Sequence, residues 1–100
     1  LPVAYRLRGI ALDRLGRPED ALAALDTARH HAVKMGALAD LWPVLADLNT
    51  VKTEMGDSVG ADEALLHAQS VIEAVADSIA EANQRRAFLW LPQVVDVMGR

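Results

Sequence analysis

Histidine and carboxylate side chains are the groups in this sequence that could carry chemistry. His30 and His31 are adjacent, so on a helix they point about 100° apart and cannot grip one metal ion together. Since metal ligation normally needs three or four convergent donors, we interpret both as solvated side chains near a helix C-terminus and predict no metal site. Glu63 and His67, four positions apart, would form a surface pair at most.

The remaining polar residues show no catalytic arrangement. No histidine stands in a recognisable nucleophile–base pattern with Ser58, Ser70 or Ser78, and the glycines near residue 60 lack the Lys-Ser/Thr of a phosphate-binding loop. Carboxylates in the first turns of two predicted helices are explained by the helix dipole, and these are Glu19, Asp20, Asp62 and Glu63. We therefore predict that the protein is not an enzyme and has no cofactor.

The composition and net charge of the chain restrict the classes of partner that it is expected to bind. The chain has 100 residues, a net charge of −4 and no cysteine, which suits one domain without disulfides. Its only basic doublet is Arg85-Arg86, and no apolar run approaches the roughly 18 residues of a spanning helix. We expect no direct nucleic-acid binding and no membrane span. Neither a signal peptide nor an initiator methionine opens the sequence, so we expect a cytoplasmic protein and a fragment of a longer chain.

Proline, glycine and cap signals divide the chain into six predicted helices, at about 2–15, 18–35, 38–55, 61–76, 80–90 and 93–98. Because a proline inside a helix removes a backbone hydrogen bond, Pro43 should lie in a first turn, which would place the start of the third helix near Leu41. Residues 57–60 are expected to form a turn, and Ser78 with Glu81 matches a capping box. Trp42 and Trp90 are each expected to pack inside the protein.

Each of the first four predicted helices has apolar residues at helical spacing. In the first helix they are Ala4, Leu7, Ala11 and Leu15; in the second, Ala21, Leu25, Ala28, Ala32 and Met35; in the third, Leu38, Leu41, Leu45, Leu48 and Met55; in the fourth, Ala61, Leu65, Ala68, Ile72 and Val75. Gly56 follows Gly16 after about 40 residues, and each half is a helix, a glycine turn and a second helix. Such halves bury their apolar stripes by stacking on each other.

The first half resembles the tetratricopeptide repeat, through Tyr5, Gly9, Leu12, Gly16, Ala21, Leu25 and Ala28. This resemblance implies an all-α, right-handed superhelix of five to six helices, with one repeat at about 2–36, a second at about 38–77 and capping helices at about 79–98. The second half fits less well. It needs about three residues inserted in its turn, and it has Asn49 where a small residue is expected and Lys52 where a large apolar one is expected.

The tail, from Ser78 to Met98, is similar to the end of repeat arrays in large bacterial signal-transduction ATPases and transcriptional regulators. This similarity implies a non-catalytic module for protein–protein interaction, binding a protein or peptide partner or other domains of the same parent chain. Two alternatives stay open: a purely structural helical spacer or oligomerisation domain, and a small-molecule-sensing repeat domain of a transcriptional activator.

If the resemblance holds, the first helix of each repeat lines the concave face of the superhelix. The candidate partner-binding residues are then Arg6, Ile10, Asp13, Arg14, Ala46, Thr50, Thr53 and Glu54. Because Asp13 and Glu54 offset the arginines, this face is a mixed polar groove, which disfavours a clamp for an acidic peptide terminus.

The N-terminal helix has apolar residues that the stripe does not use, among Leu1, Val3, Leu7 and Ile10. Since an end repeat normally needs a polar outer face, we expect this end either to mediate a homo-oligomer or to be covered in the parent chain.

Overall fold

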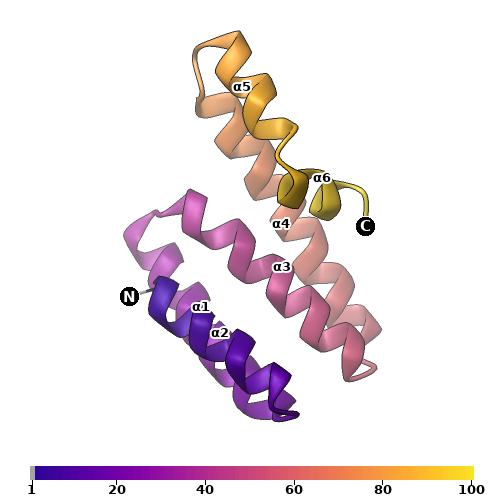
Figure 1. Cartoon of the computed structure of the whole chain (residues 1–100). Coiled ribbons are helices and arrows are strands. Elements are labelled where there is room, and N and C mark those ends of the chain that lie inside the picture. Colours follow the sequence, from indigo (N-terminus) through magenta and orange to yellow (C-terminus); the bar gives the residue numbers. More distant parts are fainter. Residues whose placement is uncertain (1) are drawn as a thin grey trace.

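The computed structural model describes residues 2–100, and that part of the chain forms six α-helices and no strand (Figure 1). The prediction of an all-α chain is thus confirmed. The helices are α1 (Pro2–Arg14), α2 (Pro18–Met35), α3 (Leu38–Glu54), α4 (Ser58–Ser78), α5 (Ala82–Leu89) and α6 (Pro92–Met98). Leu1, one of the expected self-association residues, lies outside the described part.

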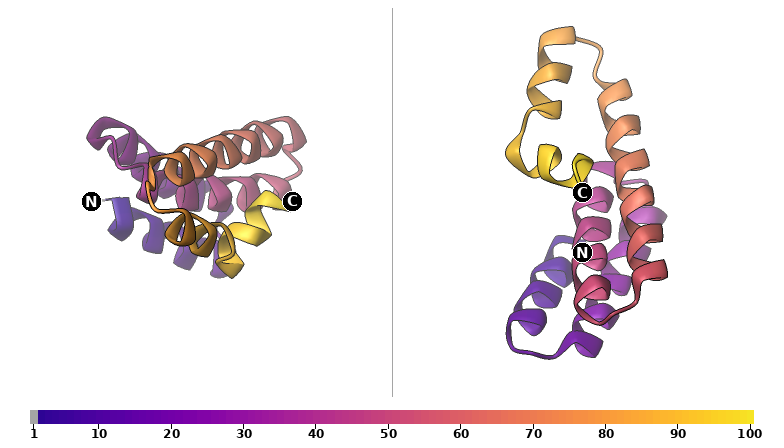
Figure 2. Two further views of the ribbon diagram at one scale, coloured as in Figure 1. Left: turned by 90° about the horizontal axis from the view of Figure 1, so that it is seen from above. Right: turned by 90° about the vertical axis from the view of Figure 1, so that its right-hand side faces the viewer.

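Two helical hairpins form the body of the molecule. Helix α1 packs on α2, and α3 packs on α4. The two hairpins are joined by the contact between α2 and α3. Helices α5 and α6 turn back along α4 (Figure 2). The principal dimensions of 41 × 27 × 20 Å describe a slightly elongated body.

The turns inside both hairpins have the same length and the same cap. Gly16 and Gly56 adopt positive φ values of 74° and 82°, a conformation that glycine reaches without strain. In each turn the next amide donates back five residues, Arg17 N to Leu12 O and Asp57 N to Lys52 O, both at 2.9 Å. The prediction of about three extra residues in the second turn was therefore wrong, and the two halves align without a gap.

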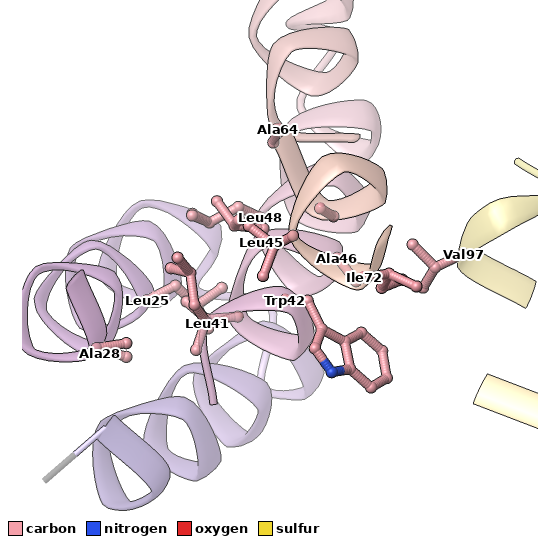
Figure 3. Packing of buried hydrophobic residues seen from close by; sticks show 14 of the residues in the cluster. Leu25, Ala28, Leu41, Trp42, Leu45, Ala46, Leu48, Ala64, Ile72 and Val97 are labelled. Carbon is pink, nitrogen blue, oxygen red and sulfur yellow. The ribbon is translucent and has the colours of Figure 1, made fainter. Parts of the chain in front are cut away.

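Buried side chains fill the space between the helices (Figure 3). The second helices of the two hairpins bury equivalent positions, Ala21, Ala24, Ala28 and Ala32 in α2 and Ala61, Ala64, Ala68 and Ile72 in α4. The predicted stripes of the second, third and fourth helices are buried for most of their length. Their ends depart from the prediction, because Met35, Leu38 and Met55 are exposed.

The first helix buries the face opposite to the predicted stripe. Ala4, Leu7, Ala11 and Leu15 are all exposed, while Tyr5 and Leu12 pack on the core. Gly9 explains this orientation, because an added Cβ there would lie 2.7 Å from Leu25 Cγ. Only a glycine lets α1 approach α2 this closely. Tyr5, Gly9 and Leu12 therefore describe the contact of α1 with α2 better than the apolar periodicity of α1 did.

Pro43 lies inside α3 and not in its first turn, so the start near Leu41 was wrong. The helix begins at Leu38, and Leu41 N donates to Ala37 O at 3.0 Å. A proline at this position leaves one helical hydrogen bond unmade and normally disfavours a helix by about 3 kcal/mol. Burial of the residues on both sides, Trp42 and Val44, offsets this cost.

Two boundaries around α4 also differ from prediction. Asp57 caps the helix by accepting a hydrogen bond from Gly60 N at 3.0 Å, so residues 58–60 are its first turn. At the other end, Ser78 belongs to α4 and donates to Val75 O at 2.6 Å. Glu81 alone caps α5, accepting from Asn83 N and Gln84 N. The expected reciprocal capping box therefore does not form.

The two tryptophans have opposite environments. Trp42 is buried and meets Phe88 edge to face, with 6.4 Å between ring centroids. Trp90 is 76% exposed, so its expected packing inside the protein was wrong. The short turn between α5 and α6 leaves its ring no neighbouring helix to pack on.

We predict that Gly9→Ala destabilises the fold by about 1–3 kcal/mol, because its new methyl would overlap the fully buried Leu25. Urea unfolding of the variant measures the cost. In a Leu25→Ala background the overlap disappears, and the same change should instead stabilise α1 by up to about 1 kcal/mol through helix propensity. Equal costs in the two backgrounds would contradict a steric origin.

Candidate functional site

The surface between α1 and α3 is hollowed along its length. One hollow of about 330 Å³ lies among α1, α3 and α6. A second, of about 230 Å³, adjoins it between α1 and α3 and shares Asp47 with it. A third, of about 440 Å³, lies at the ends of α1 and α3 and shares Asp13 with the second. We call this row of hollows the α1–α3 groove.

Seven of the eight predicted partner-binding residues are at least partly accessible along this groove. Arg6 lines the first hollow; Ile10, Asp13, Arg14 and Thr50 line the second; Glu54 lines the third. Thr53 is exposed nearby. Ala46 also lines the first hollow, but it is only 5% exposed. It therefore offers little surface to a partner.

Both threonines direct their hydroxyl protons inward. Thr50 Oγ1 donates to Ala46 O at 3.2 Å, and Thr53 Oγ1 donates to Asn49 O at 2.7 Å. These bonds to the preceding turn are common for threonine in helices. Toward a partner, the two side chains therefore offer acceptor oxygens and methyl groups.

The sequence analysis missed Asp47, which joins the first two hollows. Its Oδ2 accepts a hydrogen bond from Arg6 Nε at 2.6 Å, and the two side chains are partly exposed. Burial raises the pKa of Asp47, and the neighbouring Arg6 opposes that rise without cancelling it. A helical stripe at 47, 50 and 54 would have found this residue, since positions three and seven apart share a face.

Arg100 closes one end of the groove. Its Nη1 donates to Ala46 O at 3.0 Å, to Asn49 Oδ1 at 3.1 Å and to Thr50 Oγ1 at 3.3 Å, while Nη2 contacts Asp96 at 3.0 Å. The predicted residues gave no sign of this contact, because Arg100 follows α3 by more than forty positions. The tail thus covers part of the face that the repeat resemblance assigns to a partner.

Asn49 is buried where α3 crosses α4. Its Nδ2 donates to Ala61 O at 2.8 Å, and its Oδ1 accepts from Arg100. Gly9 and Ala21 hold the corresponding places in the first hairpin, where an added Cβ on Gly9 would lie 3.4 Å from Ala21 O. The unexpected asparagine therefore replaces a tight steric contact with a hydrogen bond.

Two carboxyl groups meet at the far end of the groove. A hydrogen bond with Asp13 raises the pKa of exposed Glu54, and burial and the charge of Asp13 act in the same direction. Together with Asp47 and Asp96, these groups give the groove more carboxylates than arginines. A cationic group on a partner would therefore be accepted more readily than an anionic one.

The described residues contain no cluster of metal-binding side chains. Within them, no three His, Asp or Glu side chains converge to hold a metal ion. His31 stacks on Tyr5 with 5.4 Å between ring centroids, and His30 is exposed beside it. In the same part of the chain, no helix has the length and apolarity needed to cross a bilayer.

We predict that Asn49→Ala destabilises the protein by about 1–3 kcal/mol, because Ala61 O loses its buried donor. Arg100→Ala should cost less, since its side chain is partly exposed. A double-mutant cycle in urea should give a coupling energy of about 0.5 kcal/mol or more between the two residues. Strictly additive effects would show that the Asn49–Arg100 contact contributes nothing.

We predict a pH-dependent contribution from Asp47. Because its pKa is raised in the folded state, the folded protein holds this proton at a pH where the unfolded chain has released it. The unfolding free energy of the wild type should therefore fall, relative to Asp47→Asn, as pH rises from about 4 through the folded pKa. Urea unfolding across this range, with carboxyl NMR titration of Asp47, measures both quantities. The prediction would be contradicted if the unfolding free energies of the two proteins changed in parallel with pH, or if Asp47 titrated with a pKa below about 3.9.

Comparisons of this chain with protein-family models, with curated proteins and with solved structures give no match. The tetratricopeptide resemblance therefore rests on the residues and contacts described above.

Proposed function

We propose that this chain is a non-catalytic protein–protein interaction module built from tetratricopeptide-like repeats in a right-handed superhelix. Three features support this proposal. The two hairpins have turns of equal length, they bury alanines at equivalent positions, and a glycine allows close contact within the first of them. Single hairpins of this kind cannot bury their apolar faces and gain stability by stacking.

The α1–α3 groove is the observation that carries the functional part of the proposal. It is continuous across both hairpins and is lined by side chains of mixed charge. A row of adjoining open hollows fits an extended or helical peptide segment, whereas a small-molecule sensor would be expected to enclose most of its ligand. We therefore favour a peptide or protein partner over a small ligand.

The wider context is part of the same proposal. The similarity of the tail to the ends of regulator arrays supports a role in cytoplasmic signal transduction in bacteria. There the groove would bind another protein or another domain of the same parent chain. Fold alone does not fix function in this class, so the groove must be tested directly.

Selection from a random-peptide display library on the immobilised chain tests the groove. We expect peptides enriched on the wild type to lose affinity by about tenfold or more in Thr50→Trp, because the indole would fill the middle hollow. Ala87→Trp is the matched control, since Ala87 is exposed on α5 and outside the groove. Equal binding to the two variants, or no enrichment on the wild type, would count against the proposal.

A structural spacer is the second candidate, and one contact favours it. Arg100 covers Ala46 and Asn49, so the C-terminal residues already occupy one end of the groove. The peptide selection separates the two candidates when repeated on Arg100→Ala. An interaction module should bind the same peptides as tightly or more tightly, whereas a spacer should bind none in either form.

A further inference from the structure

The exposed face of α1 is apolar and basic. It presents Val3 and Leu7, which are 55% and 59% exposed, together with two exposed alanines, and Leu15 directly after the helix is 72% exposed. Its only charged residues are Arg8 and Arg14, at the two edges of the stripe. The one carboxylate of α1, Asp13, faces Glu54 of α3. Ion pairs of the described residues join neither Arg8 nor Arg14 to a carboxylate.

The exposed face of α4 is apolar and acidic. Val59 and Leu66 are 69% and 67% exposed, and Ser70 and Ala74 continue the same helical stripe. The charges along this stripe are all carboxylates: Asp62, Glu63, Glu73 and Asp77. No lysine or arginine occurs in α4, and ion pairs of the described residues involve none of these carboxylates.

The two faces complement each other in both respects. An apolar stripe edged by arginines would meet a stripe on which apolar residues alternate with carboxylates, as in interfaces where charge sets the register of an apolar contact. We propose that α1 of one copy of this chain docks on α4 of a second copy. The occupant is a second copy because the same chain carries both halves of the match, and this proposal goes beyond binding in the α1–α3 groove.

The fold determines what kind of assembly this contact makes. In both views of Figure 2, α1 and α4 lie at opposite edges of the molecule, and they are not among the packed helix pairs. One copy therefore cannot pair its own two faces, and each docking leaves one α1 and one α4 free. Such a head-to-tail contact builds chains or rings, in contrast to a two-fold contact that stops at a dimer.

Sedimentation equilibrium of the whole chain tests the proposal. We expect the average mass to rise above the monomer mass of 10.8 kDa between about 10 and 500 µM, as a weak interface requires. Raising NaCl from about 0.05 to about 0.5 M should weaken the association about tenfold, because the charges at the interface are screened. A monomer at every concentration and salt would overturn the proposal.

Charge reversal separates this contact from any other mode of association. Arg8→Glu/Arg14→Glu gives a copy whose two faces are both acidic. Replacing all four carboxylates of the α4 face, in Asp62→Lys/Glu63→Lys/Glu73→Lys/Asp77→Lys, gives a copy whose two faces are both basic. Each variant alone should be monomeric, while an equimolar mixture should associate again, because each face then finds an opposite charge on the other copy. Association of either variant alone, or a mixture that stays monomeric, would overturn the proposal.

Lys34→Glu/Arg86→Glu is the matched control for Arg8→Glu/Arg14→Glu, because it makes the same change in net charge on exposed residues of α2 and α5. This control should associate as the wild type does, and its loss of association would overturn the proposed position of the interface. Circular dichroism of each variant checks that all have kept the helical fold. Because Arg14 borders the α1–α3 groove, peptide binding is compared with Arg8→Glu alone. The proposal of peptide binding in the groove and the proposal of self-association can therefore be disproved independently of each other.

Discussion

Small side chains where the helices cross determine how closely the helices of this protein pack. Gly9 lies against Leu25 and the Ala21 carbonyl, and alanines occupy the inner face of both α2 and α4. With so little side-chain bulk between them, the helices approach closely and bury larger residues at the margins of the contact. This close approach sets the orientation of α1, and the orientation of α1 determines which residues reach the groove.

In the second hairpin, a polar residue occupies the place where the two helices cross. Asn49 is 8% exposed at the place equivalent to Gly9, and it bonds to the backbone of the opposing helix. A buried amide is stable only when its donors and acceptors are paired, and Arg100 supplies the remaining partner. The C-terminal residues therefore complete the hydrogen bonding of this polar crossing. Hairpin packing and groove shape are in this way linked through one hydrogen-bonded pair.

Charge is distributed unevenly around this framework. The outer face of α1 carries arginines, the outer face of α4 carries carboxylates, and the groove between the hairpins holds both signs in contact. Within the groove, Arg6 pairs with Asp47 and Arg100 pairs with Asp96, while Asp13 contacts Glu54. The charges on the outer faces of α1 and α4 form no ion pair with another described residue, which is why the groove and the outer faces suggest different partners.

Local signals in the sequence determined the helices and their turns. Gly16, Gly36 and Gly56 marked three helix ends because their backbone angles suit glycine almost alone, and the apolar stripes of α2, α3 and α4 identified most of the core. Two helix boundaries were predicted wrongly. Pro43 was expected in the first turn of α3, and Ser78 was expected to cap α5. Both predictions failed because local propensity does not include the neighbouring helices that stabilise α3 and α4.

Only the tertiary structure decided which face of α1 is buried and which residues meet in the groove. Ala4, Leu7, Ala11 and Leu15 have the spacing of a core stripe, yet the steric fit at Gly9 directs them outward. Asp47 was missed because the prediction chose its neighbour Ala46 for the groove-facing stripe. Arg100 could not be assigned from the sequence, because it reaches the groove across a long separation. Helical periodicity identifies a stripe within one helix, whereas contacts between helices depend on shape and charge brought together by the whole fold.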